Sequence, residues 1–300
     1  LKDATAALSS AKSAQEQAKA RQRLMELQAK QAREALAKSQ QGLEPEAYAL
    51  TTAQAVKKQK DAAVKFSMPV QKTVNAENAS KFVFTLIPPG KFVMGSKIEE
   101  KDRKENERKH LVEITRPFYM LENEVTIGQW QAVTGSLPSG IRTSDRNLPV
   151  SEISFNQVEN SFLPALERYA PDGYKFRLPT EAEWEYSCRA GTITPYFSGS
   201  DIEKLSEVCV WQKDNSLPIK SRKPNAWGLY DMHGNLSELT YDWFGSYSSG
   251  SQTNPSGPSS GSDRAVRGGN WIVSDWYQRA AYRLGFDSST SGSYLGFRLL

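Results

Sequence analysis

The stretch RLPTEAEWEY, residues 177–186, contains the start signal of a helix beside two large aromatic side chains. Thr180 is followed three positions later by Glu183, the spacing of a capping box, in which each side chain bonds the backbone amide of the other residue. The same spacing occurs twice earlier in the chain: Thr126 with Gln129, and Ser154 with Gln157. Because apolar residues at helical spacing follow each pair, the sequence predicts short helices that begin at these three points.

Around these helices the sequence consists of short β-type runs and many turns. Residues 82–87 and 91–94 flank Pro88-Pro89-Gly90, a pattern that predicts a β-hairpin. After Ala190 there is almost no helical pattern, and residues 245–261 are rich in Gly, Ser and Pro. Seven Trp residues supply large areas for burial where regular structure is scarce. We therefore expect an irregular α+β domain with little regular secondary structure.

The N-terminal part differs from the rest of the chain in amino-acid composition. Residues 1–41 contain no Pro or Gly and consist mainly of Ala, Gln, Lys, Arg and Glu, which favour helix. Steps of three and four from Ala4 to Leu36 trace a mostly apolar seam, as in a coiled coil or a helical hairpin. Residues 48–66 predict another helix. We expect a helical stalk or coiled coil at 1–66, a linker at 67–80 and a globular domain at 81–300. Since an Ala-rich seam buries little area, the stalk is expected to self-associate.

Composition limits the class of protein. A chain of 300 residues with 38% apolar content and a net charge of +4 is typical of a soluble protein of one or two domains. No run of 18 apolar residues exists, so no membrane span is predicted. The positive excess lies along the helix-forming residues 1–66, which is typical of a solvated face, so no nucleic-acid partner is expected. Cys188 and Cys209 either form one disulfide or remain two buried thiols. The compartment stays open, with export or the cell surface favoured.

Six ordered motifs carry a resemblance to a known family. They are IPPGKFVMGS (87–96), EVT with Trp130 (124–130), RLPTEAEWEY (177–186), NAWGLYDMHGN (225–235), RGGNW (267–271) and GFR (296–298). Together they span roughly the last two-thirds of the chain, which resembles the formylglycine-generating-enzyme, or sulfatase-modifying-factor, family. The resemblance implies a variant of the C-type lectin fold, which agrees with the loop-rich pattern of residues 81–300.

The resemblance implies three roles: copper-dependent oxidation of a cysteine to formylglycine, non-haem-iron chemistry, or no chemistry. The oxidases carry a cysteine pair shortly after the Arg-Gly-Gly motif, because Cu(I) prefers thiolate ligands. Here Val273 stands at the first of these positions, and no cysteine follows Cys209. The iron-dependent relatives need several histidines, whereas this chain has only His110 and His233. We therefore expect neither copper nor iron. Gln278 stands where relatives place the partner of a Cys188-type cysteine, so their disulfide is expected to be absent.

A structural calcium ion is the cofactor that the resemblance implies. In the family, carboxylate or amide side chains and backbone carbonyls around the Gly-Asn motif bind Ca²⁺. The matching positions here are Asp231, Gly234, Leu236 and Glu238. Oxygen ligands in a tight loop suit this hard cation. The alternative is that the two carboxylates bond loop amides while Gly234 turns the chain.

The segment after the Arg-Gly-Gly motif lines the exposed functional face in this family. Here it mixes aromatic residues with Ser and Asp, a composition typical of adaptable binding surfaces. The predicted ligand-binding residues are Asn270, Val273, Ser274, Asp275, Trp276, Tyr277, Phe286 and Tyr294. The leading hypothesis is a non-catalytic binding or display module for a protein, peptide or glycan.

Three alternatives stay open. The first is a metal-dependent oxidoreductase of the sulfatase-modifying-factor or non-haem-iron type, built from unfamiliar ligands. The second is a variable receptor whose C-terminal segment is diversified by a retroelement, as in some members of the fold. The third is a structural protein that the N-terminal helices assemble.

Overall fold

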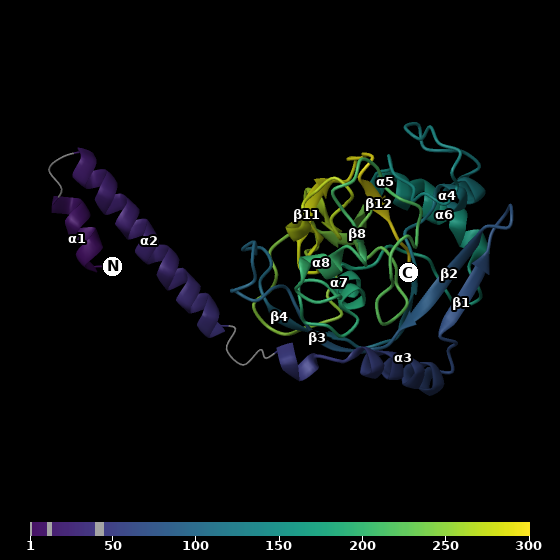
Figure 1. Ribbon diagram of the computed structural model, residues 1–300, viewed down its shortest axis with the longest axis horizontal. Coiled ribbons are helices and arrows are strands. Elements are labelled where there is room, and N and C mark those ends of the chain that lie inside the picture. The colour runs from purple at the N-terminus through teal and green to yellow at the C-terminus, as the bar shows by residue number, and fades with distance from the viewer. Residues whose placement is uncertain (1, 11–13, 40–44) are drawn as a thin grey trace. The chain divides into compact units, whose positions relative to one another are not determined.

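The computed structural model describes residues 2–10, 14–39 and 45–300, and the chain divides into two compact units, Leu1–Leu43 and Glu44–Leu300 (Figure 1). The first unit contains two helices, α1 (Lys2–Ser10) and α2 (Ala14–Ser39), which contact each other. Ala4 is buried in this contact, whereas Met25 is 63% exposed. Helical structure at the N-terminus is thus confirmed. Ala11 and the side chain of Leu36, both on the predicted seam, lie outside the described residues.

The second unit begins earlier than the sequence predicted. After a 3₁₀ turn, η1 (Pro45–Tyr48), helix α3 (Thr52–Phe66) starts at a capping box on Thr51 and packs against β2 (Lys81–Ile87). The boundary placed at residue 66 is therefore wrong, because α3 belongs to the globular unit. The predicted linker 67–80 is also wrong, since it contains strand β1 (Gln71–Asn75), which pairs with β2.

Small and polar side chains on one face of α3 explain this difference. Ala55 and Ala62 are buried in the core of the unit. Gln59 is 5% exposed, and its Nε2 donates to the carbonyl oxygen of Leu86 at 2.8 Å. The indole Nε1 of Trp227 donates to the carbonyl of Ala55 at 3.1 Å. Such a face looks solvated in the sequence, because only the tertiary partners show that Gln59 is buried.

The described residues form four small sheets. In the first, β2 lies between β1 and β5 (Phe118–Leu121), with both pairs antiparallel. In the second, β4 (His110–Ile114) lies between β3 (Gly90–Met94) and β9 (Gln252–Thr253). Strands β2 and β3 thus belong to different sheets, and the predicted hairpin around Pro88-Pro89 is wrong. Two successive prolines offer no backbone N–H to a ladder, so the chain crosses from one sheet to the next.

The other two sheets lie in the second half of the chain. The larger has the order β11-β10-β8-β12, and a short parallel pair joins β6 to β7. Their bounds are β6 Cys209–Val210, β7 His233–Gly234, β8 Ser237–Trp243, β10 Asp263–Arg267, β11 Arg283–Asp287 and β12 Leu295–Phe297.

The three predicted helix starts are confirmed, each with both hydrogen bonds of its capping box. They open α4 (Ile127–Thr134), α5 (Phe155–Gln157) and α7 (Glu181–Arg189). A π-helical turn (Val158–Phe162), α6 (Leu163–Leu166) and a 3₁₀ turn (Glu167–Tyr169) continue α5. After Ala190 the described helices are only α8 (Ile202–Leu205) and the 3₁₀ turn η4 (Asp275–Gln278). The expected irregular α+β architecture is confirmed.

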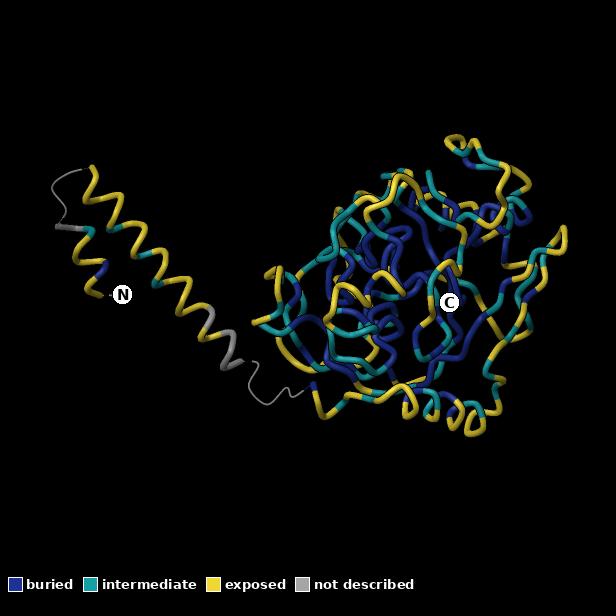
Figure 2. Tube along the Cα trace, in the orientation of Figure 1, coloured by how far each residue is buried: buried dark blue, intermediate teal, exposed yellow. Residues whose placement is uncertain are grey.

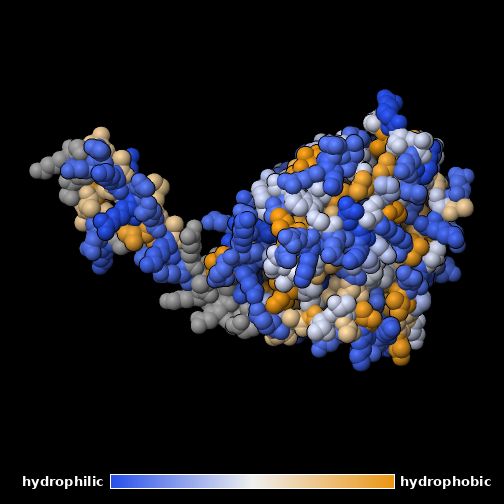
Figure 3. Space-filling view, viewed as in Figure 1, coloured by the Kyte–Doolittle hydropathy of each residue, from blue (hydrophilic) through white to orange (hydrophobic). Residues whose placement is uncertain are grey.

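Burial is concentrated in the globular unit, whereas most described side chains of the N-terminal helices are exposed (Figure 2). One large apolar cluster joins β2, α4, α5 and the β8–β10–β12 sheet, and another surrounds β3, β4, α7 and Trp227. On the face shown in Figure 3, hydrophobic residues form separate patches among hydrophilic ones. No described helix is both long and apolar enough to span a bilayer.

Candidate functional site

The segment between β10 and β11 forms the candidate site. It starts at Gly268 and Gly269, both with positive φ (95° and 68°), conformations that glycine adopts without strain. A Cβ on Gly269 would lie 2.3 Å from Oε1 of Gln278, so the close approach also requires glycine. The Gln278 amide, fully buried, donates to the carbonyl of Asn270 at 2.9 Å. Gln278 thus holds both ends of the loop 270–278 together.

An apolar cavity of about 230 Å³ opens on this segment. Five predicted ligand-binding residues line it: Asn270, Val273, Tyr277, Phe286 and Tyr294. The other lining residues are Ser237, Val266, Arg267, Gly269, Ile272, Tyr282 and Leu284. Aromatic contacts fix two walls, because Tyr277 meets the ring of Tyr282 edge-on at 5.0 Å and Phe286 lies 6.1 Å from Tyr294. The structure therefore brings most of the predicted binding residues into one cavity.

The side chains of Asn270 and Ser237 in this cavity are bonded within the protein. Asn270 Nδ2 donates to Ser237 Oγ at 3.0 Å, and Asn270 Oδ1 accepts from the amide of Ile272 at 3.0 Å. The Ser237 hydroxyl in turn donates to the carbonyl of Gly269 at 3.1 Å. The cavity consequently presents mainly carbon atoms.

Asp275 and Trp276 face a second, polar cavity of about 350 Å³. Its other lining residues are Lys101, Asp102, Pro195, Tyr196, Ser200, Asp201, Ile202 and Arg279. The ring of Trp276 stacks on Tyr277 at 3.6 Å, so the η4 turn separates the two cavities. Ser274 lines neither cavity and flanks the start of η4.

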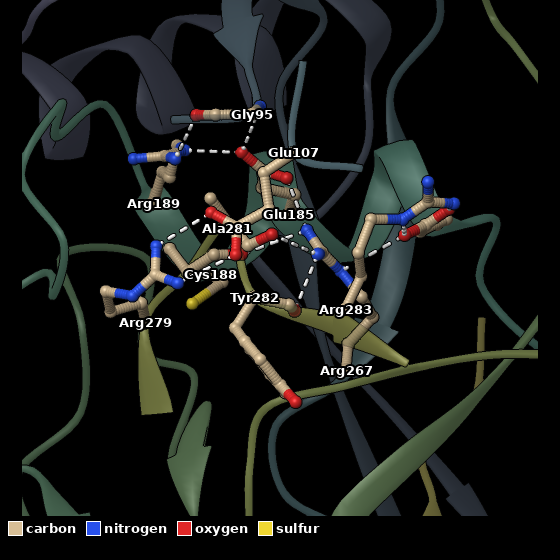
Figure 4. A network of polar contacts seen from close by, with 12 residues as sticks. Gly95, Glu107, Glu185, Cys188, Arg189, Arg267, Arg279, Ala281, Tyr282 and Arg283 are labelled. Atoms are coloured by element: carbon tan, nitrogen blue, oxygen red, sulfur yellow. Dashed lines mark hydrogen bonds and ion pairs between the residues drawn. The ribbon is translucent and has the colours of Figure 1, made fainter. Parts of the chain in front are cut away.

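Buried ion pairs hold the wall of the apolar cavity (Figure 4). Glu185 of α7 accepts hydrogen bonds from Arg267 Nη2, from Arg189 Nε at 2.8 Å and from the amide of Gly95 at 2.9 Å. Arg267 also donates to the carbonyl of Tyr282 at 2.7 Å. Both side chains of the Arg267–Glu185 pair are fully buried. The network therefore fixes the backbone from which Tyr282 projects into the cavity.

Two more arginines anchor the same segment. Arg283 pairs with Glu181 at 2.6 Å, and Arg279 pairs with Glu107 at 2.7 Å, in each case among buried side chains. Arg279 also contacts Glu100 at 2.7 Å. Residues 279–283 are thus held at both ends, which fixes the backbone that carries Tyr282.

Cys188 and His233 meet in the interior but cannot act as a nucleophile and base. Both cysteines are free and buried, and Cys188 Sγ lies 3.8 Å from Nε2 of His233. That nitrogen already accepts from the amide of Phe197 at 3.0 Å, and Nδ1 lies 2.7 Å from the carbonyl of Gln278. Burial lowers the pKa of His233 to about 4 and raises the pKa of the Cys188 thiol. The thiol therefore stays protonated.

Two of the four predicted calcium residues, Glu238 and Asp231, accept hydrogen bonds within the protein, while Asp231 Oδ1 is buried without a hydrogen-bond partner. Glu238 accepts two hydrogen bonds from Arg298, at 2.6 and 2.7 Å, and one from Trp184 Nε1 at 2.7 Å. Asp231 Oδ2 accepts from the amide of Lys220 at 2.9 Å, while burial raises the pKa of Asp231 to about 6. The fully buried guanidinium of Arg298 therefore supplies a counter-charge to Glu238. Among the described residues, no group of three or more His, Cys, Asp or Glu side chains could hold a metal ion.

The sequence did not single out several residues of the apolar cavity. Ser237, Val266 and Gly269 come from β8, β10 and the turn that follows β10, and their shared exposure to one cavity depends on strand pairing. Tyr282 and Leu284 lie within the aromatic segment 270–294, so their position in that segment was the available signal.

Small twisted sheets, short capped helices and long loops define a scaffold of the formylglycine-generating-enzyme kind, a C-type-lectin-like fold. Two solved structures share it. Treponema denticola variable protein 1 superimposes with a TM-score of 0.70 and 26% identity, covering 77% of this chain and 99% of that one. PvdO from Pseudomonas aeruginosa has a TM-score of 0.67 and 24% identity, covering 76% of this chain and 97% of that one.

Residues 69–300 match the sulfatase-modifying factor enzyme 1-like domain, and the chain belongs to this family. The formylglycine-generating enzyme of Streptomyces coelicolor is 32% identical over 215 residues, 63% of this chain and 66% of the enzyme. The bovine enzyme is 37% identical over 141 residues, 41% of this chain. That alignment spans only 38% of the bovine enzyme's length.

Proposed function

We propose that this family member is a non-catalytic ligand-binding or display module, and that its ligand is a protein, peptide or glycan bound by residues 270–294. One observation carries the proposal: where the resemblance implies a catalytic thiol, Val273 lines an apolar cavity. The two cysteines of the chain are buried elsewhere, and burial raises the pKa of both thiols. The site is therefore suited to contact rather than to nucleophilic or redox chemistry.

The binding test uses the full chain, immobilised and screened against a random peptide library and a glycan array. We expect enriched ligands whose binding falls at least tenfold when Trp276 and Tyr277 are both changed to Ala. Ser249→Ala, at an exposed position outside residues 270–294 and outside both cavities, is the control and should bind normally. Ligands that bind the double variant normally would place the site elsewhere. Stoichiometric copper or iron in the purified protein would instead support the metal-dependent oxidoreductase.

The second candidate is a variable receptor. It is supported by the 26% identity to Treponema denticola variable protein 1, whose name describes variation. Sequencing this gene in many related isolates tests it. We expect substitutions concentrated at cavity and rim positions between Ile272 and Tyr294, with residues 296–298 unchanged. Substitutions spread evenly over residues 69–300 would contradict it.

An assembly role for the N-terminal helices is the third candidate. It is supported by the exposure of Met25 on the predicted seam, because a 26-residue helix with so little burial is marginal alone. Light scattering of the full chain and of a 45–300 fragment tests it. An oligomeric full chain and a monomeric fragment are expected, and two monomers would remove the assembly role.

A further inference from the structure

We infer that the apolar cavity binds one aromatic side chain of a partner protein, which would anchor that partner on this face. The inference rests on the proposed binding function and narrows its three ligand classes to one. It follows from the volume of the cavity, the state of its polar groups and the surface around it.

The volume fits a single side chain. Apolar cavities of about 150 Å³ bind benzene, whereas pockets for drug-sized ligands measure roughly 300–1,000 Å³. The cavity beside Val273 measures about 230 Å³, which is enough for a phenyl or indole ring and too little for an oligosaccharide.

The lining chemistry excludes a sugar as the deep ligand. A sugar ring needs several hydrogen-bond partners, since a polar group that is buried without one costs about 1–3 kcal/mol. The side chains of Asn270 and Ser237 already form hydrogen bonds with each other and with the backbone. Most of the remaining wall is apolar, and the rings of Tyr277, Tyr282, Phe286 and Tyr294 favour edge and face contacts with another ring.

The surroundings favour a partner protein over a free small molecule. Ile272 is 48% exposed at the cavity rim, and the stacked Trp276 and Tyr277 continue the surface toward the polar cavity. An aromatic anchor in a preformed pocket, with a polar region beside it, is the arrangement of a protein–protein hot spot. Because buried ion pairs fix residues 279–283, little ordering cost accompanies insertion of the anchor.

The test follows the methyl resonances of Ile272, Val273 and Leu284 by NMR in the full chain. Three probes are titrated: N-acetyl-tryptophanamide, N-acetyl-serinamide and methyl α-D-glucopyranoside. We expect only the tryptophan amide to shift these resonances in a saturable way. Val273→Trp fills the cavity and should weaken this binding at least tenfold, whereas Ser249→Trp places the same side chain at an exposed position outside the proposed binding segment and should not.

The outcomes separate this inference from the proposed function. Methyl shifts with the glucoside, and none with the tryptophan amide, would overturn the aromatic anchor while leaving a binding site in place. If no probe shifts the methyls although library ligands still require Trp276 and Tyr277, the cavity inference fails alone. Should the Ser249→Trp variant lose binding as fully as Val273→Trp, the cavity is not the site of the probe.

Discussion

The buried pair between Arg267 and Glu185 offers the sharpest test of how the fold holds the apolar cavity. Changing Glu185 to Gln keeps the shape of the side chain and removes its charge. The guanidinium of Arg267 and that of Arg189, which is 5% exposed, then lose their shared counter-charge. Breaking a fully buried pair from one side costs about 3–5 kcal/mol. Glu181 Oε1 still lies 3.7 Å from Arg267 Nε, so the lower end of this range is expected. At roughly 2–4 °C for each kcal/mol in a domain of this size, we expect the melting temperature to fall by about 10 °C.

Differential scanning calorimetry of the full chain measures this fall. Glu113→Gln is the matched control, since Glu113 pairs with Lys91 at 3.4 Å while both side chains are over 40% exposed. Such a surface pair contributes about 0–1 kcal/mol, so the control should melt within a few degrees of the parent protein. If Glu185→Gln melts as the control does, the buried network does not stabilise the domain and our account of the cavity wall is refuted.

Three other predictions concern pH, thiols and calcium. Burial and the charge of Glu181 raise the pKa of Asp242 to about 7, so between about pH 4 and 7 the folded state binds a proton that the unfolded state has released. The free energy of unfolding should therefore fall as the pH rises through this range, and it should fall less in Asp242→Asn. Urea unfolding measured across this pH range tests both expectations. Cys188 and Cys209 should react with Ellman's reagent only after unfolding, and fast reaction of the folded protein would contradict their burial. Because Arg298 neutralises Glu238, a calcium chelator should shift the melting temperature by less than about 1 °C. A large fall in the melting temperature would instead indicate that calcium binds at the predicted residues.

The capping-box patterns in the sequence correctly predicted the starts of helices α4, α5 and α7. A capping box involves residues three apart, so its chemistry is complete within one turn. The motifs likewise identified the family. They also predicted that Val273 and Tyr277 lie on one exposed face, and both line the same cavity.

Features that depend on distant partners were missed. Strand β2 pairs with β1 and β5 rather than with the adjacent β3, and the run Lys81–Ile87 does not specify which neighbour it takes. The sequence predicted helix α3 as part of a stalk because Gln59 is a polar residue. Gln59 is buried because its amide donates to the carbonyls of Leu86 on β2 and of Trp227, which are distant in the sequence.

The sequence by itself thus determined the family, the helix starts and the lack of a cysteine after Cys209, since each is written in residues close together or in the residue types alone. Tertiary structure decided that Glu185 pairs with Arg267, 82 positions away, and that the side-chain amide of Asn270 donates to Ser237 within the protein. It also decided that the Cys188 thiol stays protonated, because desolvation depends on what surrounds the sulfur. The stretch RLPTEAEWEY shows both levels: its capping box and the pairing of Glu183 with Arg177 are local, whereas Arg283 of β11 and Arg267 of β10, which pair with Glu181 and Glu185, reach α7 only through the fold.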